Sequence, residues 1–234
     1  MIPLKDTIPS RTVPVVNYAL ILINVVLFLY QISLGYELEK FLYTWGVVPA
    51  FFFAPFTYRE LWLFDRVLPL VTSMFLHGGW LHLLGNMLYL YIFGDNVEDR
   101  LGHIKYLFFY VLCGVFAVIA HLLTNPYSRV PTIGASGAIA GVMGAYFFLF
   151  PYARVVTLIF IFFFIDVIEI PAFFFLAFWF ILQFLNGTIS FSAQNAASGG
   201  VAWWAHIGGF IAGIMLLFLF GVHRTTRRTR FYHS

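Results

Sequence analysis

The chain has 234 residues, of which 62% are hydrophobic and only 10% are charged, and its formal net charge is +3. Soluble domains carry about 25% charged residues, so the composition excludes an ordinary water-soluble globular protein and predicts an integral membrane protein. The small positive charge gives no indication of nucleic-acid binding, and the expected partner of the basic C-terminal residues is the lipid bilayer with its anionic headgroups.

Six apolar segments are candidates for membrane spans, because a spanning helix needs about 20 apolar residues. The expected spans are Val15–Leu34, Val71–Phe93, Ile104–Leu123, Ser136 to just before Pro151, 171–186 and Val201–Val222. The predicted fold class is therefore an all-α membrane protein, a bundle of six transmembrane helices. The domain division that follows is a cytoplasmic N-terminal segment (1–14), a six-span domain (15–222) and a basic cytoplasmic tail (223–234).

Three connections differ from ordinary loops. Residues 35–70 are rich in aromatic side chains, including Trp45 and Trp62, which predicts a first loop that lies in the membrane interface. Residues 152–170 contain an apolar run that is too short for a span, and we expect a connection that lies along the membrane. Residues 186–200 are small and polar and precede the last expected span.

The distribution of basic residues predicts the orientation, because cytoplasmic loops carry an excess of Lys and Arg. With both termini cytoplasmic, the inner side carries Lys5, Arg11, Arg100, Lys105, Arg154, Arg224, Arg227, Arg228 and Arg230. The outer side then carries only Lys40, Arg59, Arg66 and Arg129. A seventh span at 152–170 would place the tail arginines outside, so the charges favour six spans. We expect a multi-pass protein of the cell (inner) membrane with both termini cytoplasmic.

Polar residues occur at one predicted depth of the bundle, near the outer end of three spans. Ser136 begins the fourth expected span, His206 lies early in the sixth, and His82 and Asn86 lie early in the second. Polar side chains inside membrane spans are costly and usually mark function. The sequence therefore predicts a polar site, lined by these four residues and His77, within the bilayer.

Ser136 and His206 have the residue types of a nucleophile and its general base. Serine needs such a base within hydrogen-bond reach, and Gly134 and Gly137 leave room for a substrate beside the hydroxyl. A second interpretation of Gly134–Gly137 is a small-residue packing patch, which is common in membrane helices.

Glycine spacing predicts that the two helices carrying this pair pack closely. Gly137 and Gly141 share one helical face beside Ser136, and His206, Gly209 and Gly213 share another. Two such smooth faces can pack backbone to backbone. That contact would bring the imidazole near the hydroxyl.

His82 and Asn86 are four residues apart and share a helical face. Their N–H groups, together with the backbone N–H of Ser136, could donate to an oxyanion. The alternative is a hydrogen bond between helices. His77 is five residues before His82, so we expect it to point elsewhere and to secure the preceding connection.

No carboxylate is available to orient the histidine, because Asp95 and Asp166 fall at the other membrane face in this topology. The expected arrangement is a dyad. A His-Glu-x-x-His zinc motif is absent and the single cysteine, Cys113, cannot form a cysteine-based metal site, so no metal or cofactor is expected. The remaining histidines receive no predicted role: His103, His121, His223 and His233.

These motifs together resemble those of the rhomboid intramembrane serine proteases. The resemblance covers about residues 15–222 and rests on His82-x-x-x-Asn86, Gly134-x-Ser136-Gly137 and Ala205-His206-x-x-Gly209-x-x-x-Gly213. It implies a minimal bacterial-type member that cuts transmembrane proteins near the outer membrane face. By motif match, Ser136 would be the nucleophile and His206 the base, while Asn86 and His82 would help to hold the oxyanion.

The chain departs from the family pattern at two places. The Trp-Arg pair that some bacterial members carry before the second span reads Leu68-Pro69 here. The tyrosine that can stack on the base in some members is Ala140. Both leave the dyad intact, and the second leaves open what holds the imidazole.

The predicted reaction is peptide hydrolysis through an acyl-enzyme on Ser136. We expect residues 186–200 to act as a lid over the polar cavity and the fifth span to act as a lateral gate.

Two other functions are possible for such a chain. An inactive member that binds transmembrane helices would be expected to lack the serine or the histidine. A small transporter would place polar residues in both membrane halves. The physiological substrate and the oligomeric state do not follow from the sequence.

Overall fold

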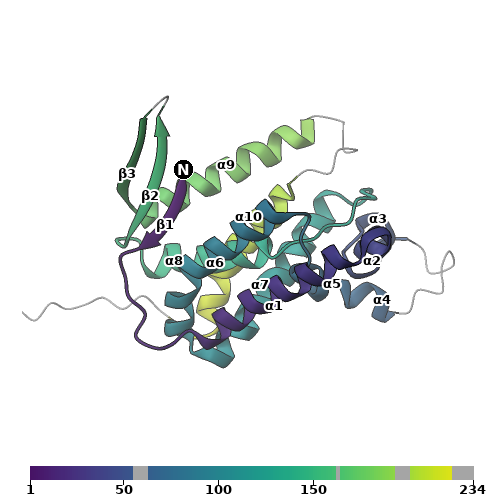
Figure 1. The fold of residues 1–234 in the computed structure, drawn as a ribbon, viewed down its shortest axis with the longest axis horizontal. Coiled ribbons are helices and arrows are strands. Elements are labelled where there is room, and N and C mark those ends of the chain that lie inside the picture. The colour runs from purple at the N-terminus through teal and green to yellow at the C-terminus, as the bar shows by residue number, and fades with distance from the viewer. Residues whose placement is uncertain (55–62, 162–163, 193–200, 223–234) are drawn as a thin grey trace, which may run out of the picture.

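A computed structural model describes residues 1–54, 63–161, 164–192 and 201–222. Helices dominate this part of the chain (Figure 1). The long helices are α1 (Val15–Ser33), α6 (Trp80–Leu101), α7 (His103–Thr124), α8 (Ser136–Leu149), α9 (Ala172–Ser192) and α10 (Trp203–Leu219). The first connection contains short helices: η1 (Gly35–Glu37), α2 (Leu38–Trp45), α3 (Pro49–Phe52), α4 (Leu63–Val67), α5 (Pro69–Thr72) and η3 (Ser73–Phe75).

Three described helices are long and apolar enough to cross a membrane by themselves: Val15–Ser33, His103–Thr124 and Ala172–Ser190. A fourth crossing results if the pair Asp65–Phe75 and Trp80–Leu101, bent by 81°, forms one span. The two remaining long helices are apolar but shorter, with 14 residues in α8 and 17 in α10. The chain is a multi-pass membrane protein, whereas the count of six spans stays a prediction.

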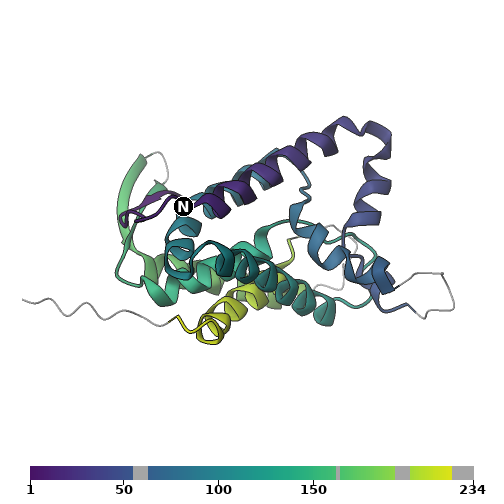
Figure 2. The ribbon, with the colours of Figure 1, turned by 90° about the horizontal axis from the view of Figure 1, so that it is seen from below.

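The helix α8 forms the centre of the bundle, with α6, α7 and α10 packed around it (Figures 1 and 2). Every residue from Gly137 to Tyr146 is buried. Small residues make this possible, because they let neighbouring backbones approach α8 closely. The helix that begins at the predicted nucleophile is therefore the most enclosed element of the described structure.

Glycines form a backbone-to-backbone contact between α8 and α10. A methyl group added at Gly213 would overlap the carbonyl oxygen of Gly141, and one added at Gly209 would overlap that of Gly137. The same holds for Gly144 against the carbonyl of Phe210. The contact thus depends on the absence of side chains on both helices.

The N-terminus of α1 is held by a carboxylate from α6. Glu98 is fully buried and accepts hydrogen bonds from the backbone N–H groups of Val16 at 3.0 Å and Asn17 at 2.7 Å. These donors have no partner within their own helix, and the negative charge complements the positive end of the helix dipole. His103 also contacts this carboxylate, at 2.5 Å. The polar end of α6 thus anchors α1.

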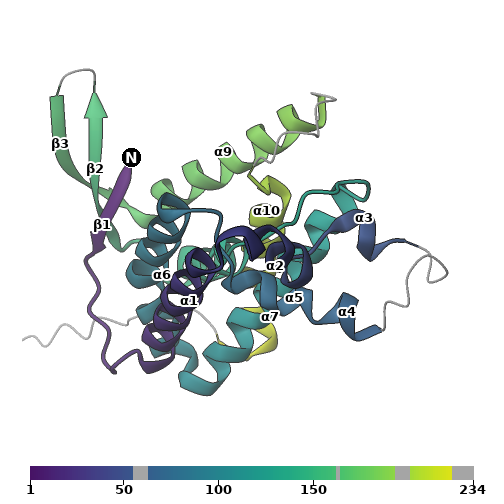
Figure 3. The same cartoon turned by 45° about the vertical axis from the view of Figure 1, so that its right-hand side comes forward.

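The all-α expectation is wrong in one respect, because the described residues include a three-stranded antiparallel sheet. Its strands are β1 (Ile2–Asp6), β2 (Arg154–Ile161) and β3 (Phe164–Pro171), in the order β1-β2-β3. Most of the connection at 152–170 is thus a hairpin, and the N-terminal segment pairs with it (Figure 3). Ala153, Val155 and Thr157 are buried in alternation with more exposed residues. This period of two in burial is typical of a strand with one covered face, and the almost uniformly apolar sequence of the strand does not show it.

The second expected span begins later than predicted. Helix η3 ends at Phe75, residues 76–79 are not helical, and α6 begins at Trp80 and continues past Phe93 to Leu101. The glycines Gly78 and Gly79 explain the break, because paired glycines favour turns.

The fifth expected span is longer than predicted. Helix α9 runs to Ser192, so the first part of the expected lid at 186–200 is helical. Residues 193–200 lie outside the described residues.

The attachment of β1 predicts a pH-dependent stability. Asp6 accepts hydrogen bonds from Tyr146 at 2.5 Å and Asn96 at 3.0 Å. Burial, with the nearby charge of Asp95 as a smaller cause, raises the pKa of Asp6 from 3.8 to about 6. The native state therefore holds this proton more tightly than the unfolded chain. Stability should fall as pH rises from about 4 to about 6 and should then level off.

We expect Asp6→Asn to flatten the melting temperature of the detergent-solubilised protein between about pH 4 and 6 relative to wild type. The exposed hairpin carboxylate Asp166 offers the matched control, Asp166→Asn. An unchanged pH profile in Asp6→Asn would contradict the coupling.

Candidate active site

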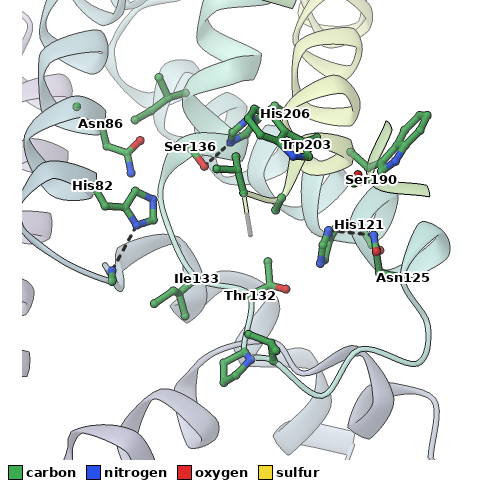
Figure 4. A pocket seen from close by; sticks show the side chains of 18 of the residues that line it. His82, Asn86, His121, Asn125, Thr132, Ile133, Ser136, Ser190, Trp203 and His206 are labelled. Atoms are coloured by element: carbon green, nitrogen blue, oxygen red, sulfur yellow. Dashed lines mark hydrogen bonds between the residues drawn. The ribbon is translucent and has the colours of Figure 1, made fainter. Parts of the chain in front are cut away.

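A cavity of about 950 Å³ lies within the described bundle and is lined by residues from α6, α7, α8, α9 and α10. Its polar lining includes His82, Asn86, His121, Asn125, Ser136 and His206. Figure 4 shows His82 and Asn86 on one side of this space, with Ser136 and His206 across from them. The structure thus brings together four of the five residues that the sequence places at one depth.

Ser136 and His206 are hydrogen-bonded to each other across the contact between α8 and α10. The Oγ of Ser136 lies 2.8 Å from the Nε2 of His206 (Figure 4). His206 lies in the first turn of α10 and is 8% exposed. This is the distance and atom pairing that a serine and its general base require.

The turn before Ser136 is held by the backbone. Gly134 has φ +125°, a conformation that side chains rarely adopt, and its N–H donates to the carbonyl of Ser73 at 2.9 Å. A methyl group added at Gly134 would also lie 2.8 Å from Nε2 of His82. Glycine is therefore required here both for the turn and for the approach of the histidine.

The other ring nitrogen of His206 contacts a side chain for which no role is predicted from the sequence. Its Nδ1 lies 2.8 Å from the Oε1 of Gln183, on α9. Gln183 was detectable from the sequence, because a polar residue within an apolar span usually marks function. Gln183 carries an amide, whereas the orienting group of a Ser-His-Asp triad is a carboxylate.

Two tryptophans flank the imidazole of His206. The Trp179 ring centroid lies 5.8 Å from that of the histidine at an interplanar angle of 35°, and Trp203 meets it edge-on at 6.4 Å. Ala140 carries no ring, so in this chain an aromatic neighbour of the histidine comes from α9.

His82 and Asn86 line the cavity, and both side chains carry N–H donors. The Nδ1 of His82 accepts the N–H of Gly78 at 3.3 Å, so a neutral ring carries its proton on Nε2, the nitrogen nearest Gly134. The Nδ2 of Asn86 is buried and makes no hydrogen bond within the described residues. Both side chains thus have donor capacity that the fold leaves unused.

His77 is not among the residues that line the described cavity, contrary to one prediction and in agreement with the other, that it points elsewhere. It lies in the break before α6, 2% exposed, with its ring packed edge-on against that of His82 at 5.1 Å. Its backbone is bonded twice by the side-chain amide of Gln31, through its N–H and its carbonyl, each at 3.0 Å. His77 thus lies behind His82, where the break between the two helices is attached to α1.

His121 and Asn125 line the opposite wall of the cavity, although no role is predicted for them from the sequence (Figure 4). His121 lies in the last turn of α7 and Asn125 directly follows its end, and the Nδ2 of Asn125 is 3.4 Å from the Nδ1 of His121. Their spacing of four residues was a detectable signal of a shared helical face.

The sequence matches the Rhomboid domain over residues 64–223. The chain belongs to the rhomboid family. This confirms the family predicted from the motifs, and the apolar helices are those of an integral multi-pass membrane protein. The match begins after the first predicted span and within the first connection.

The chain is similar to several curated rhomboid proteins. It is 28% identical over 155 residues to Rhomboid protein 1, mitochondrial, of Saccharomyces cerevisiae, an alignment that covers 62% of this chain and 40% of that protein. It is 36% identical over 76 residues to RHOMBOID-like protein 5 of Arabidopsis thaliana, covering 32% and 25%. It is 41% identical over 76 residues to Rhomboid protease GluP of Bacillus subtilis, covering 32% and 14%. The chain thus spans well under half the length of these relatives.

The glycine contact between α8 and α10 is testable by adding single methyl groups. Gly213→Ala should force the two backbones apart, lower the free energy of unfolding by about 1–3 kcal/mol and displace His206 from Ser136. A lower melting temperature would show the first effect, and slower covalent labelling of Ser136 by a fluorophosphonate would show the second.

Gly85→Ala is the matched stability control, because a methyl group at this helical position meets nothing within 4 Å. It should be neutral, or stabilising by up to about 1 kcal/mol. Equal melting temperatures for the two variants would contradict a tight contact at Gly213.

Proposed function

We propose that the protein is an intramembrane serine endopeptidase that cleaves transmembrane proteins. The single observation that carries the proposal is the hydrogen bond of 2.8 Å between Ser136 Oγ and His206 Nε2 at the wall of a cavity inside a membrane bundle. Membership of the rhomboid family supports the same function.

The reaction begins with attack of Ser136 Oγ on the carbonyl carbon of the scissile peptide bond. His206 Nε2 takes the serine proton as the C–O bond forms, and the carbonyl becomes a tetrahedral oxyanion. The C–N bond then breaks and His206 gives the proton to the leaving amine. Water attacks the resulting ester with His206 again as base, which releases the new carboxyl end and restores the serine.

Three N–H donors are suited to hold the oxyanion. They are the Nδ2 of Asn86, the Nε2 of His82 and the backbone N–H of Ser136 at the start of α8. A helix N-terminus offers free backbone donors, and its dipole favours negative charge. Each such donor can lower the barrier by about 2.7–4 kcal/mol.

The length of α8 accounts for a site below the membrane surface. Its 14 residues give a helix of about 21 Å, shorter than the hydrocarbon core of about 30 Å. With both termini cytoplasmic, as the charges predict, Ser136 lies toward the outer face. The proposed substrate enters between helices, with α9 as the lateral gate.

The alternative, an inactive member that binds transmembrane helices, has less support. It does not require a serine hydroxyl and an imidazole in hydrogen-bond contact, and this chain has that contact.

Covalent labelling tests the nucleophile and the base. We expect the purified protein to react with a fluorophosphonate at Ser136 and the labelling to be lost in Ser136→Ala and His206→Ala. Ser33→Ala is the matched control, because Ser33 is exposed and bonds only the carbonyl of Tyr30 among the described contacts. Equal labelling of wild type and Ser136→Ala would refute the proposed enzyme.

Removal of one oxyanion donor should slow the reaction without unfolding the protein. Because the Asn86 amide nitrogen makes no hydrogen bond in the described structure, Asn86→Leu should retain the melting temperature. The cleavage rate of a transmembrane substrate should fall about 100- to 1,000-fold. An unchanged rate would remove Asn86 from the proposed machinery.

A further inference from the structure

Gln183 on α9 contacts His206 on the side of the ring opposite Ser136. Its Oε1 lies 2.8 Å from His206 Nδ1, and the two side chains are 7% and 8% exposed. A polar side chain in an apolar membrane helix is costly unless it is paired. Here the pair is formed with the proposed catalytic base, which gives the contact a consequence for the chemistry.

A second hydrogen bond fixes which way the Gln183 amide faces. Its Nε2 donates to the carbonyl of Trp179 at 3.3 Å, one turn earlier on α9. Because the amide has its donors on nitrogen and its acceptor on oxygen, this bond leaves the oxygen toward His206. An amide oxygen only accepts, so the hydrogen in the contact belongs to Nδ1 of His206.

The position of that proton determines the state of the other ring nitrogen. A neutral imidazole that carries its proton on Nδ1 has an unprotonated Nε2. This is the nitrogen that lies 2.8 Å from Ser136 Oγ and must accept the serine proton. The chain of contacts therefore runs from the Trp179 carbonyl through Gln183 and His206 to Ser136.

We propose that Gln183 is a positioning residue that holds the base in its reactive tautomer and orientation. It would perform, without a charge, the orienting task that a buried aspartate performs in a Ser-His-Asp triad. A neutral acceptor suits this place, because a carboxylate inside an apolar bundle is expensive. The role rests on the proposed function, since it has meaning only if His206 acts on Ser136.

The base is thereby tied to a third helix. Ser136 belongs to α8 and His206 to α10, whereas Gln183 and Trp179 both come from α9 and contact the same ring. Helix α9 lies at the edge of the bundle beside α10 (Figures 1 and 3). Its position therefore sets the orientation of the base.

Two substitutions separate positioning from packing. Gln183→Met keeps a similar unbranched side chain but removes the acceptor. Its rate of fluorophosphonate labelling should fall by up to about 100-fold, the smaller end of what general acid–base catalysis contributes, while the folded state is retained with a slightly lower melting temperature, because Nδ1–H loses its acceptor. In this reaction Ser136 Oγ displaces fluoride from phosphorus and His206 takes the serine proton, so labelling reports the base directly.

Gln183→Glu keeps the acceptor and adds a negative charge, which favours the imidazolium form of His206. Labelling should recover to within a few-fold of wild type at alkaline pH, and the acid limb of its pH profile should move to higher pH. The other titratable groups lining the described cavity are His82, Tyr89 and His121. They are the same in every variant, so the shift reports residue 183.

Asn186→Leu is the matched control, because Asn186 lies on the same helix and bonds only the Leu182 carbonyl among the described contacts. It should label at the wild-type rate. A wild-type rate and pH profile in Gln183→Met, or an acid limb in Gln183→Glu that does not move, would overturn the role of Gln183. In either case the loss of labelling in Ser136→Ala would leave the proposed function intact.

If Gln183→Met does not fold, the acid limb of the pH profile of labelling in Gln183→Glu tests the role of Gln183 by itself. Failure of the wild type to label would overturn the proposed function and the role of Gln183 together. The two failures are thus distinguishable.

Discussion

The site depends on the backbone contact between α8 and α10. Gly209 and Gly213 meet the carbonyl oxygens of Gly137 and Gly141 with no side chain between them. Helix axes normally lie 8–10 Å apart, and small residues, glycine above all, permit a closer approach. A serine and a histidine on two such helices reach each other with short side chains, so their relative position is set by the backbone rather than by flexible rotamers.

The rest of the bundle supports this pair. Glu98 attaches the start of α1 to α6, and Gln31 at the other end of α1 attaches the break that precedes α6. These bonds fix the helix that carries His82 and Asn86. The proposed oxyanion donors are thus positioned by polar contacts well away from the reacting atoms.

Helix α9 is both a candidate membrane span and a neighbour of the His206 ring. It is long and apolar enough to be a span by itself, yet it carries Gln183 and Trp179 against the imidazole. An element placed at the edge of the bundle thereby contributes to the orientation of the proposed base. The absence of a carboxylate therefore does not leave His206 without an orienting hydrogen-bond partner.

Local pattern was sufficient to predict the membrane character, the family, and the starts of α7 and α8 to within a residue. These features depend on spacing along one helix. The sheet went unpredicted because residues 155–161 are almost uniformly apolar, so the sequence shows no alternation and the run resembles a short membrane segment. The partner of its first strand, moreover, lies about 150 residues away along the chain.

The sequence by itself determined which residue types could react and on which helices they lie. Only the tertiary structure decided their partners: that Gln183 meets His206, that His77 is packed behind His82, and that His121 lies on the cavity wall. The physical reason is that spacing fixes a side chain's direction around its own helix. The rotation and depth of one helix against another depend on packing over the whole interface.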